Sequence, residues 1–331
     1  MKKLIALLLC VLMVLSVFAG CASQSAPASS ESSAEASAPA ASEETASSEE
    51  AASSEEAAPA SSGDKVVKIG VFEPQTGDNG AGGKQEILGM QYANYVQPTV
   101  EIGGETYDVK LEIVDNRTTA ENGPSAASEL MNRGVSIVLG SYGSGVSIAA
   151  GTYFANAKIP AIGCSCTNAA VTAGNDYYFR VCFLDPFQGT VHANYAFKEM
   201  DAKKAYTLAM LGSDYDQGLV YYFKQAFEAL GGTVVSEDFP EGNANFVSYI
   251  NNAMADGADV IFCPVSTNYA QLIIEAAAAQ GFKGAILGTD TVDNNMVLES
   301  TKGKDVRLLV TTLYQEGGSP EFDEGIKKWL N

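Results

Sequence analysis

The sequence has few of the residues and motifs that mark an enzyme active site. Its 331 residues include a single histidine, His192, and no G-x-S-x-G, no G-K-[ST] and no G-x-G-x-x-G directly after an expected strand. These absences remove the sequence support for a nucleophile elbow, a P-loop and a dinucleotide-binding loop. His192 falls in a helical stretch after Pro186, so we expect it on a helix surface or between lobes. We therefore predict that the protein is not an enzyme.

Basic residues are also scarce. Lysine and arginine together number 20 against 40 aspartates and glutamates, which gives a formal net charge of −20 at pH 7. Nucleic-acid binding needs a basic surface that neutralises phosphates, so we expect no nucleic-acid partner. Long apolar runs are limited to the N-terminus, and no later stretch of 18 apolar residues occurs that could span a membrane.

The first 20 residues have the pattern of an export signal. Two lysines after the initial methionine precede an apolar stretch, residues 4–18, and small residues close the segment. The order Phe18-Ala19-Gly20-Cys21 resembles the bacterial lipoprotein box, in which the cysteine is lipidated and becomes the mature N-terminus. Leucine is usual where Phe18 stands, and an ordinary signal peptide with an incidental cysteine is the alternative. We predict lipidation of Cys21.

Residues 22–64 have the composition of a disordered tether. They are nearly all Ser, Ala, Glu and Pro, with eight Glu, one Asp and no Lys or Arg. Such a segment cannot bury enough apolar surface to offset its ordering entropy, and a flexible coil of this length extends roughly 35–40 Å. We expect residues 21–64 to be a lipidated cysteine and linker that hold a folded domain at the outer face of a bacterial membrane.

Cysteine is infrequent, and four of the six cysteines fall in the expected folded part: Cys164, Cys166, Cys182 and Cys263. Export permits disulfides, and Cys164 or Cys166 could pair with Cys182. Metal binding is the least favoured interpretation, because one residue separates Cys164 from Cys166 where zinc sites have two or more. Buried free thiols are favoured, and the disulfide stays open.

The folded part, residues 65–331, alternates short apolar runs with amphipathic stretches. Its 267 residues carry 31 acidic and 18 basic side chains and are enough for two lobes with separate cores. This alternation is typical of parallel sheets with helices on both faces, so we predict an α/β fold of two doubly wound parallel-sheet lobes. Strands are expected at residues 66–72, 107–114, 136–139, 161–162, 178–183, 205–210, 233–237, 260–263, 285–287 and 306–311, and helices at residues 86–96, 123–132, 146–157, 222–230 and 271–280.

Two loops with hydroxyl groups follow strands in the first half. Residues 140–145 and 163–167 both combine Gly with Ser or Thr, and the first loop opens an expected helix. Ligands in such folds lie beyond the carboxyl ends of the strands, where helix N-termini carry unpaired N–H groups and partial positive charge. Ser144, Ser165 and Thr167 could therefore receive a carboxylate.

Loops of the second half carry complementary groups. Asp290, at a strand end, could receive an ammonium, and Tyr215 and Tyr269 could supply apolar walls with polar tips. Each side chain alone is also a common loop cap, but their joint placement at strand ends favours a binding site. No catalytic residue, metal or cofactor is predicted.

At these loops the sequence resembles the substrate-binding lipoproteins of ABC importers for branched-chain amino acids, which have the type I periplasmic-binding fold. The resemblance runs from about Lys65 to the end of the chain and implies two lobes joined by hinge strands. It rests on the order and spacing of short motifs: Val67-Lys-Ile-Gly-Val-Phe72, Thr76-Gly77, Val138-Leu139-Gly140 with Ser144, Ile159-Pro160, Thr167-Asn168, Phe179-Arg180-Val181, Asp214-Tyr215 with Gly218, and Gly288.

The resemblance also implies roles for single residues. Ser144 and Thr167 fall where the family holds the carboxylate of an amino acid, and the backbone of Ser165 falls where it binds ligand polar groups. Tyr215 stands at an aromatic position of the second lobe, and Asp290 at the position of an acid that receives the ammonium. Because Asp is one methylene shorter than the Glu of leucine binders, the ligand would lie slightly differently or a water would bridge.

Two positions depart from the family pattern. Gly82 stands where the first loop often carries an aromatic residue, and Ser266 stands at another aromatic position, with Tyr269 nearby. Both changes predict a roomier or more polar pocket, so leucine specificity is not implied. The relatives also continue well past Leu330, so we expect a truncated sequence or a protein that lacks part of its N-terminal lobe.

These observations predict an extracytoplasmic receptor with an N-terminal lobe at residues 65–182 and a C-terminal lobe at 183–312. The chain is expected to cross near residues 181–188 and again near 312–317, and residues 313–331 return toward the first lobe. The receptor would capture a branched-chain or similar small amino acid or amide and deliver it to an ABC permease. The alternative is a ligand-sensing module of a signalling system with the same fold and cleft.

Overall fold

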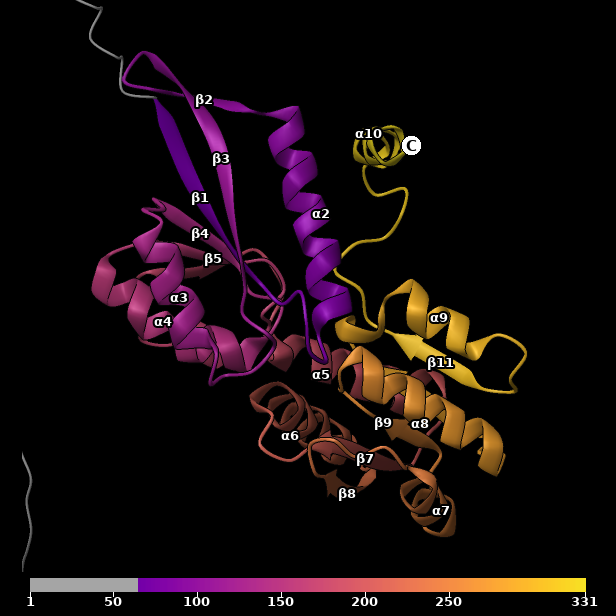
Figure 1. Cartoon of the computed structure of the whole chain (residues 1–331). Coiled ribbons are helices and arrows are strands. Elements are labelled where there is room, and N and C mark those ends of the chain that lie inside the picture. Colours follow the sequence, from indigo (N-terminus) through magenta and orange to yellow (C-terminus); the bar gives the residue numbers. More distant parts are fainter. Residues whose placement is uncertain (1–64) are drawn as a thin grey trace, which may run out of the picture. The chain divides into compact units, whose positions relative to one another are not determined.

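A computed structural model describes residues 65–331 of the chain (Figure 1). The predicted export signal, the predicted lipidation site Cys21 and the tether at 22–64 lie outside the described residues. Between residues 65 and 331, none of the helices combines the length and the apolar character needed to cross a membrane.

Six strands form the first sheet, in the order β2-β3-β1-β4-β5-β6. Phe72 of the central strand packs on one face with helices α3 (Gly123–Asn132) and α4 (Ser144–Ala157), and Val71 packs on the other face with α2 (Gly80–Val96). Successive residues of a strand point to opposite faces, so helices cover both sides of the sheet. The strands are β1 (Val66–Glu73), β2 (Thr99–Ile102), β3 (Glu105–Asp115), β4 (Ile137–Gly140), β5 (Ala161–Gly163) and β6 (Tyr178–Arg180).

The edge strand β2 is a feature that the sequence prediction missed. It pairs antiparallel with β3, whereas the other neighbours in this sheet run parallel. Gly103 and Gly104 connect the two strands with positive φ values of 61° and 81°, which is the backbone of a tight type I′ hairpin turn. The Gly-Gly pair between two β-branched runs was the available signal. The first sheet is therefore parallel with one antiparallel edge.

Five parallel strands form the second sheet, in the order β11-β10-β9-β7-β8. One face packs on α7 (Val247–Ala255) and α8 (Thr267–Gln280), and the other packs on α5 (Asp185–Asn194) and α6 (Asp214–Ala229) (Figure 1). Helix α9 (Asn295–Thr301) precedes the last strand. The strands are β7 (Lys204–Met210), β8 (Thr233–Phe239), β9 (Val260–Phe262), β10 (Ala285–Gly288) and β11 (Arg307–Val310). The predicted fold class, two doubly wound α/β lobes, is confirmed.

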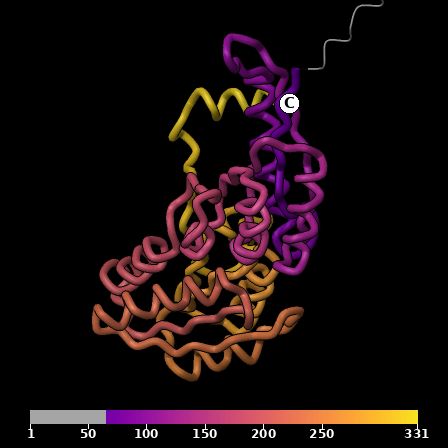
Figure 2. Tube along the Cα trace, turned by 90° about the vertical axis from the view of Figure 1, so that its left-hand side faces the viewer, coloured from indigo at the N-terminus to yellow at the C-terminus, as the bar shows by residue number. Residues whose placement is uncertain are grey.

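The last helix, α10 (Pro320–Leu330), lies beside the first lobe although it follows the last strand of the second (Figure 2). Its Phe322 and Trp329 rings pack against Tyr92 of α2, with ring centroids 5.8 and 5.7 Å apart. Aromatic pairs at such distances add to the apolar area that they bury.

The ten predicted strands are all present, whereas four of the five predicted helices begin earlier than predicted, α2 and α6 by the largest number of residues. Helix α2 begins at Gly80 rather than residue 86, and α6 begins at Asp214 rather than residue 222. Apolar periodicity starts only after the polar, Gly-rich first turns, so it marks the packed part of a helix and not its true beginning. The difference matters because it places Glu86 inside α2 and Asp214 at the N-terminus of α6.

His192 is buried, which corrects the expectation of a helix-surface or interlobe residue. Only 5% of its surface is exposed, its ring lies 5.3 Å from that of Phe262, and its Nε2 lies 3.3 Å from Thr311 Oγ1. Helix α5 turns this side chain toward the second sheet. Burial lowers the pKa of His192 to about 4. The residue is therefore a neutral core histidine of the second lobe.

This burial predicts a pH dependence of stability that the variant His192→Gln should lack. Between about pH 6.5 and pH 4, the unfolded chain binds a proton at His192 and the folded chain does not, so acidification favours unfolding. From pH 7 to pH 5, the free energy of unfolding of the wild type should fall by about 2 kcal/mol more than that of His192→Gln. Urea unfolding of both proteins at the two pH values measures this, and parallel pH profiles would contradict it.

Candidate functional site

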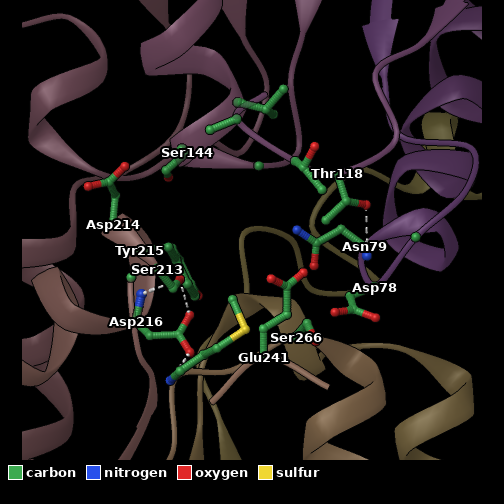
Figure 3. A pocket seen from close by; sticks show the side chains of 18 of the residues that line it. Asp78, Asn79, Thr118, Ser144, Ser213, Asp214, Tyr215, Asp216, Glu241 and Ser266 are labelled. Carbon is green, nitrogen blue, oxygen red and sulfur yellow. Dashed lines mark hydrogen bonds between the residues drawn. The ribbon is translucent and has the colours of Figure 1, made fainter. Parts of the chain in front are cut away.

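A cavity of about 560 Å³ lies between the carboxyl ends of the two sheets (Figure 3). Its walls come from the loops after β1, β3 and β4 on one side and from those after β7, β8, β9 and β10 on the other. Strand β1 lies between β3 and β4, and β7 lies between β8 and β9, so the cavity faces the point in each sheet where the strand order reverses. Such switch points are the usual ligand sites of open α/β sheets.

Four of the residues that the sequence pointed to line this cavity: Ser144, Tyr215 and Ser266 (Figure 3), and Tyr269 as a wall. Ser144 is the first residue of α4, and its Oγ accepts a hydrogen bond of 3.3 Å from the backbone N–H of Asn168. Ser266 precedes α8, and its buried Oγ has no hydrogen-bond partner within residues 65–331. The cavity therefore presents hydroxyl groups at the starts of helices from both lobes.

Asp290 lies directly after β10 and is held by Tyr215 and Gln188. Its Oδ1 lies 2.6 Å from the Tyr215 hydroxyl and accepts a hydrogen bond of 2.9 Å from Gln188 Nε2, and the Asp290 N–H donates to Gln188 Oε1 at 3.1 Å. Burial raises the pKa of Asp290, while the hydrogen bonds from Tyr215 and Gln188 lower it. The structure brings Tyr215 and Asp290 together, and Gln188 is an orienting residue that the sequence prediction missed.

Ser165 and Thr167 lie behind the cavity wall, in the interior. Both are buried, and neither hydroxyl has a hydrogen-bond partner in the described part of the chain. Asp185 lies next to Thr167, and both of its carboxyl oxygens are also buried without a partner. Burial raises the pKa of Asp185 to about 7. Buried polar atoms are almost always hydrogen-bonded, so this group of orphaned oxygens indicates a place for a polar ligand.

Gly82 does not leave the open space that the sequence predicted. A Cβ atom at Gly82 would lie 2.3 Å from Cζ of Tyr142, so the tyrosine ring already lies against this glycine. The hydroxyl of Tyr142 donates a hydrogen bond of 3.3 Å to the backbone oxygen of Thr291 in the other lobe. An aromatic wall is therefore present here, but it comes from the loop after β4. The aromatic residue within that Gly/Ser loop was the signal that could have identified it.

The close approach of Gly82 and Tyr142 predicts that Gly82→Ala destabilises the fold. The new methyl group must displace the ring, so we expect a loss of about 1–3 kcal/mol in the free energy of unfolding. Gly89→Ala is the matched control in the same helix, because nothing lies within 4 Å of its Cβ position and alanine favours helix. Urea unfolding should show Gly89→Ala to be neutral or more stable. Equal effects of the two substitutions would contradict the prediction.

The four cysteines at residues 164, 166, 182 and 263 are free thiols, as the favoured interpretation had it. Burial raises the pKa of Cys166 to about 11 and that of Cys263 to about 12, so both stay protonated near neutral pH. Among residues 65–331, one group of possible metal ligands occurs, formed by Glu73, Glu86 and Cys164. This group does not resemble a cysteine-rich zinc site, because it contains only one cysteine.

Two α/β lobes with a cavity and buried hydroxyl and carboxyl groups at their strand ends define a solute-binding protein. A family model described as periplasmic binding protein matches residues 66–326. The chain belongs to the periplasmic binding protein family, as the motifs at its strand ends predicted.

Individual relatives agree with this assignment. The Leu/Ile/Val-binding protein homolog 1 of Brucella melitensis is 30% identical over 268 residues, which are 80% of this chain and 71% of the relative. The leucine-binding protein LivK from Thermotoga maritima has 31% sequence identity to this chain. Its crystal structure matches with a TM-score of 0.74 over 80% of this chain and 75% of that chain. These relatives are solute-binding proteins and not enzymes.

A more distant likeness concerns the fold alone. A solute-binding protein of an ABC transporter from R. palustris, solved with 4-hydroxybenzoate, is 23% identical with a TM-score of 0.70, over 80% of this chain and 73% of that chain. The same fold thus serves aromatic acids as well as amino acids. The protein is an extracytoplasmic solute-binding protein of the LivK type, and the class of its solute must be argued from its own residues.

Proposed function

We propose that this protein captures an α-amino acid between its two lobes and delivers it to the permease of an ABC importer. The observation that carries the proposal is the set of buried oxygens of Ser165, Thr167 and Asp185 that have no partner in the described part of the chain. Asp185 in turn lies near Asp290. An amino acid presents a carboxylate and an ammonium a short distance apart. The site offers hydroxyl groups for the first and a carboxylate for the second.

The carboxylate would lie at the N-terminus of α4. This helix of 14 residues begins at Ser144 without a side-chain cap, so its first backbone N–H groups are free to bind an anion. Ser144 Oγ and Thr167 Oγ1 would add donors from the two neighbouring loops. Each charge-assisted hydrogen bond contributes roughly 1.5–3 kcal/mol in a site without water.

The ammonium would lie against Asp290. The Tyr215 hydroxyl and Gln188 hold this carboxylate in place, and they leave its other oxygen free to accept a bond from the ligand. An aromatic acid such as 4-hydroxybenzoate has no cation for this position and would leave a buried carboxylate unpaired, which is unfavourable. The acid at residue 290 therefore supports an amino acid over a benzoate.

Closure of the lobes would complete the site. Hydrogen bonds between the lobes at the cavity include Tyr142 to the Thr291 backbone, Asn168 Nδ2 to the Asp214 backbone oxygen at 2.7 Å, and Asn268 Nδ2 to Asp78 Oδ1 at 3.3 Å. In the proposed mechanism, a lobe at residues 65–182 and one at 183–312 close like a hinge, and residues 313–331 return to the first lobe. The permease would recognise this closed form. A lipid on Cys21 would keep the receptor at the outer face of the membrane.

Titration calorimetry of the purified protein with each of the twenty amino acids, with small amides and with 4-hydroxybenzoate tests the proposal. At least one amino acid should bind with micromolar affinity or better, which corresponds to about −8 kcal/mol. The benzoate should give no heat. Absence of heat with every amino acid would contradict the proposal, and so would preferential binding of the benzoate.

A further inference from the structure

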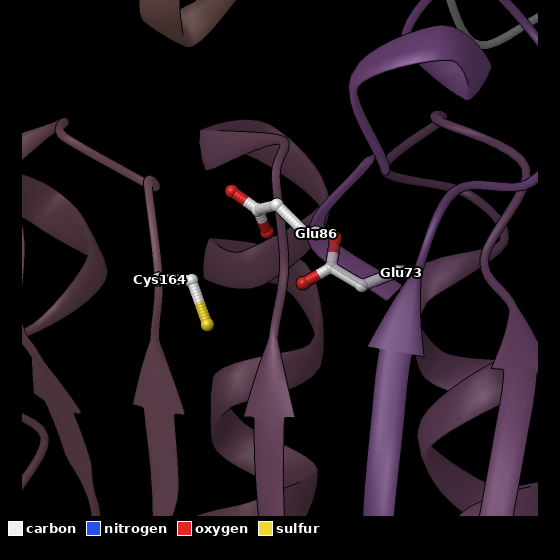
Figure 4. Close-up of side chains that lie close together, drawn as sticks. All are labelled: Glu73, Glu86 and Cys164. Carbon is white, nitrogen blue, oxygen red and sulfur yellow. The ribbon is translucent and has the colours of Figure 1, made fainter. Parts of the chain in front are cut away.

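Two glutamates that the predicted site did not include lie together in the first lobe. Glu73 ends β1 and is fully buried, and Glu86 projects from the second turn of α2 toward it (Figure 4). A carboxyl oxygen of each and Sγ of Cys164 lie within 4.8 Å of one another. The Tyr142 N–H donates a hydrogen bond of 2.7 Å to Glu73 Oε2. The remaining oxygens, Glu73 Oε1 and Glu86 Oε2, are buried and have no partner within the described residues.

Burial and mutual repulsion keep this pair from carrying two charges. Burial raises the pKa of Glu73 well above its usual range, and the Glu86 carboxyl adds to the increase. Burial also raises the pKa of Glu86, and Asp290 of the other lobe raises it further. Two carboxyls this close repel each other when both are ionised, so the pair carries at most one negative charge until a cation binds.

Within residues 65–331, no positively charged side chain compensates this charge. Arg180 lies in the same lobe, but its guanidinium donates to the backbone oxygens of Cys166 and Asn168, both at 2.9 Å, and to Thr172. None of the ion pairs in residues 65–331 includes Glu73, Glu86 or Asp290. A buried carboxylate without a counter-ion is unfavourable, so the site lacks a cation that a ligand can supply.

The Ser165 hydroxyl gives a second, independent sign of a ligand. Its residue is 96% buried, since only 4% of its surface is exposed, and its Oγ has no hydrogen-bond partner in the described chain. It lies beside Glu86. Ser165 also belongs to the loop that holds Thr167, so the glutamate pair and the proposed carboxylate position share one wall.

We propose that Glu73 and Glu86 form a cation subsite of the ligand cleft, which receives an ammonium or guanidinium group. The identity of the ligand also rests on the proposed function. If Ser144, Thr167 and Asp290 hold the α-carboxylate and the α-ammonium, then the ligand is a basic amino acid whose side chain reaches the two glutamates. The charges then balance, because Asp290 pairs with the α-ammonium and the glutamate pair with the side-chain cation.

The charge of the cavity between the two sheets favours the same ligand. Five acidic residues line the cavity, Asp78, Glu121, Asp214, Asp216 and Glu241, against one basic residue, Arg117. A cleft lined mainly by negative charge concentrates cations at its entrance and speeds their association. The association of a neutral amino acid such as leucine is not accelerated by this negative charge.

Titration calorimetry with arginine, lysine and ornithine against leucine and glutamine tests the subsite. We expect at least one basic amino acid to bind ten times more tightly than either neutral one. Glu86→Gln should weaken the basic ligand at least tenfold, and Glu73→Gln is a second variant with the same expectation. Glu321→Gln removes the same charge from the exposed helix α10 and should leave all affinities unchanged. Thermal unfolding confirms that each variant is folded.

Several outcomes would overturn the subsite. The first is tighter binding of leucine or glutamine than of every basic amino acid. The second is an unchanged affinity for the basic ligand in both glutamate variants. The third is binding of Zn²⁺ alone, if both Glu86→Gln and Cys164→Ala abolish it. Binding of 1,4-diaminobutane without binding of any amino acid would support the cation subsite and contradict the proposed function. The failure of one proposal is thus distinguishable from the failure of the other.

Discussion

Replacing Asp290 with alanine should weaken the binding of an amino acid by well over tenfold. The ligand ammonium would lose its only carboxylate partner from the second lobe and remain desolvated between the lobes. A hydrogen bond between charged groups contributes roughly 1.5–3 kcal/mol, which corresponds to about 10- to 150-fold in affinity. Calorimetric titration of the wild type and of Asp290→Ala with the amino acid that binds most tightly measures the effect.

Stability separates this loss of binding from a loss of folding. Burial raises the pKa of Asp290, so in the absence of ligand its charge opposes folding at neutral pH. Asp290→Ala should therefore unfold at the same temperature as the wild type or at a higher one, although it binds poorly. Asp293→Ala, an exposed acid three residues further on, is the matched control and should bind normally. Unchanged affinity in Asp290→Ala would remove Asp290 from the site.

Replacing Phe223 with alanine should produce the largest loss of stability, about 3–5 kcal/mol in the free energy of unfolding. The ring is fully buried and stacks on Phe262 of β9, with centroids 4.3 Å apart and planes at 12°, and on Phe227 at 5.4 Å. Its removal leaves a cavity between α6 and the second sheet. Because α6 carries Tyr215 in its first turn, ligand affinity should fall as well.

The neighbouring residue on the exposed side of the same helix is the control. Tyr221 is 54% exposed, so Tyr221→Ala removes a similar ring without opening a cavity, and its effect should stay within about 1 kcal/mol. Urea unfolding of the three proteins gives the comparison. A loss below 1.5 kcal/mol for Phe223→Ala would mean that the ring stack does not support the second core as proposed.

Much of the candidate site follows from one rule about parallel sheets. Because the carboxyl ends of parallel strands meet at one edge, residues just after the predicted strands are expected to lie together. Tyr215 and Asp290 are 75 residues apart in the chain and share a hydrogen bond, and Ser144 and Tyr215 line one cavity. The apolar strand pattern alone was sufficient to place these side chains near each other.

The site residues that the sequence prediction missed lie at positions about which this rule says nothing. Glu73 is the last residue of β1 and lies one position beyond the strand predicted at residues 66–72. Glu86 was predicted as the first residue of a helix, although it lies inside α2. Tyr142 covers Gly82 because two segments approach to within van der Waals contact, and no local pattern encodes that approach. His192 was predicted to lie in a helix, but the sequence did not show which face of that helix, α5, packs on β9.

The fold class, the family and the sheet edge where we propose that a ligand binds followed from three features of the sequence. These are the two Gly- and hydroxyl-rich loops, the alternation of strands and helices, and the family motifs. These depend on short-range patterns, which a single sequence displays directly. The tertiary structure alone decided which side chains meet across the sheets and between the lobes: Tyr142 against Gly82, Gln188 against Asp290 and Glu73 beside Glu86. Such contacts depend on packing between elements distant in the chain, and they set the charge of the site and hence the ligand that we infer.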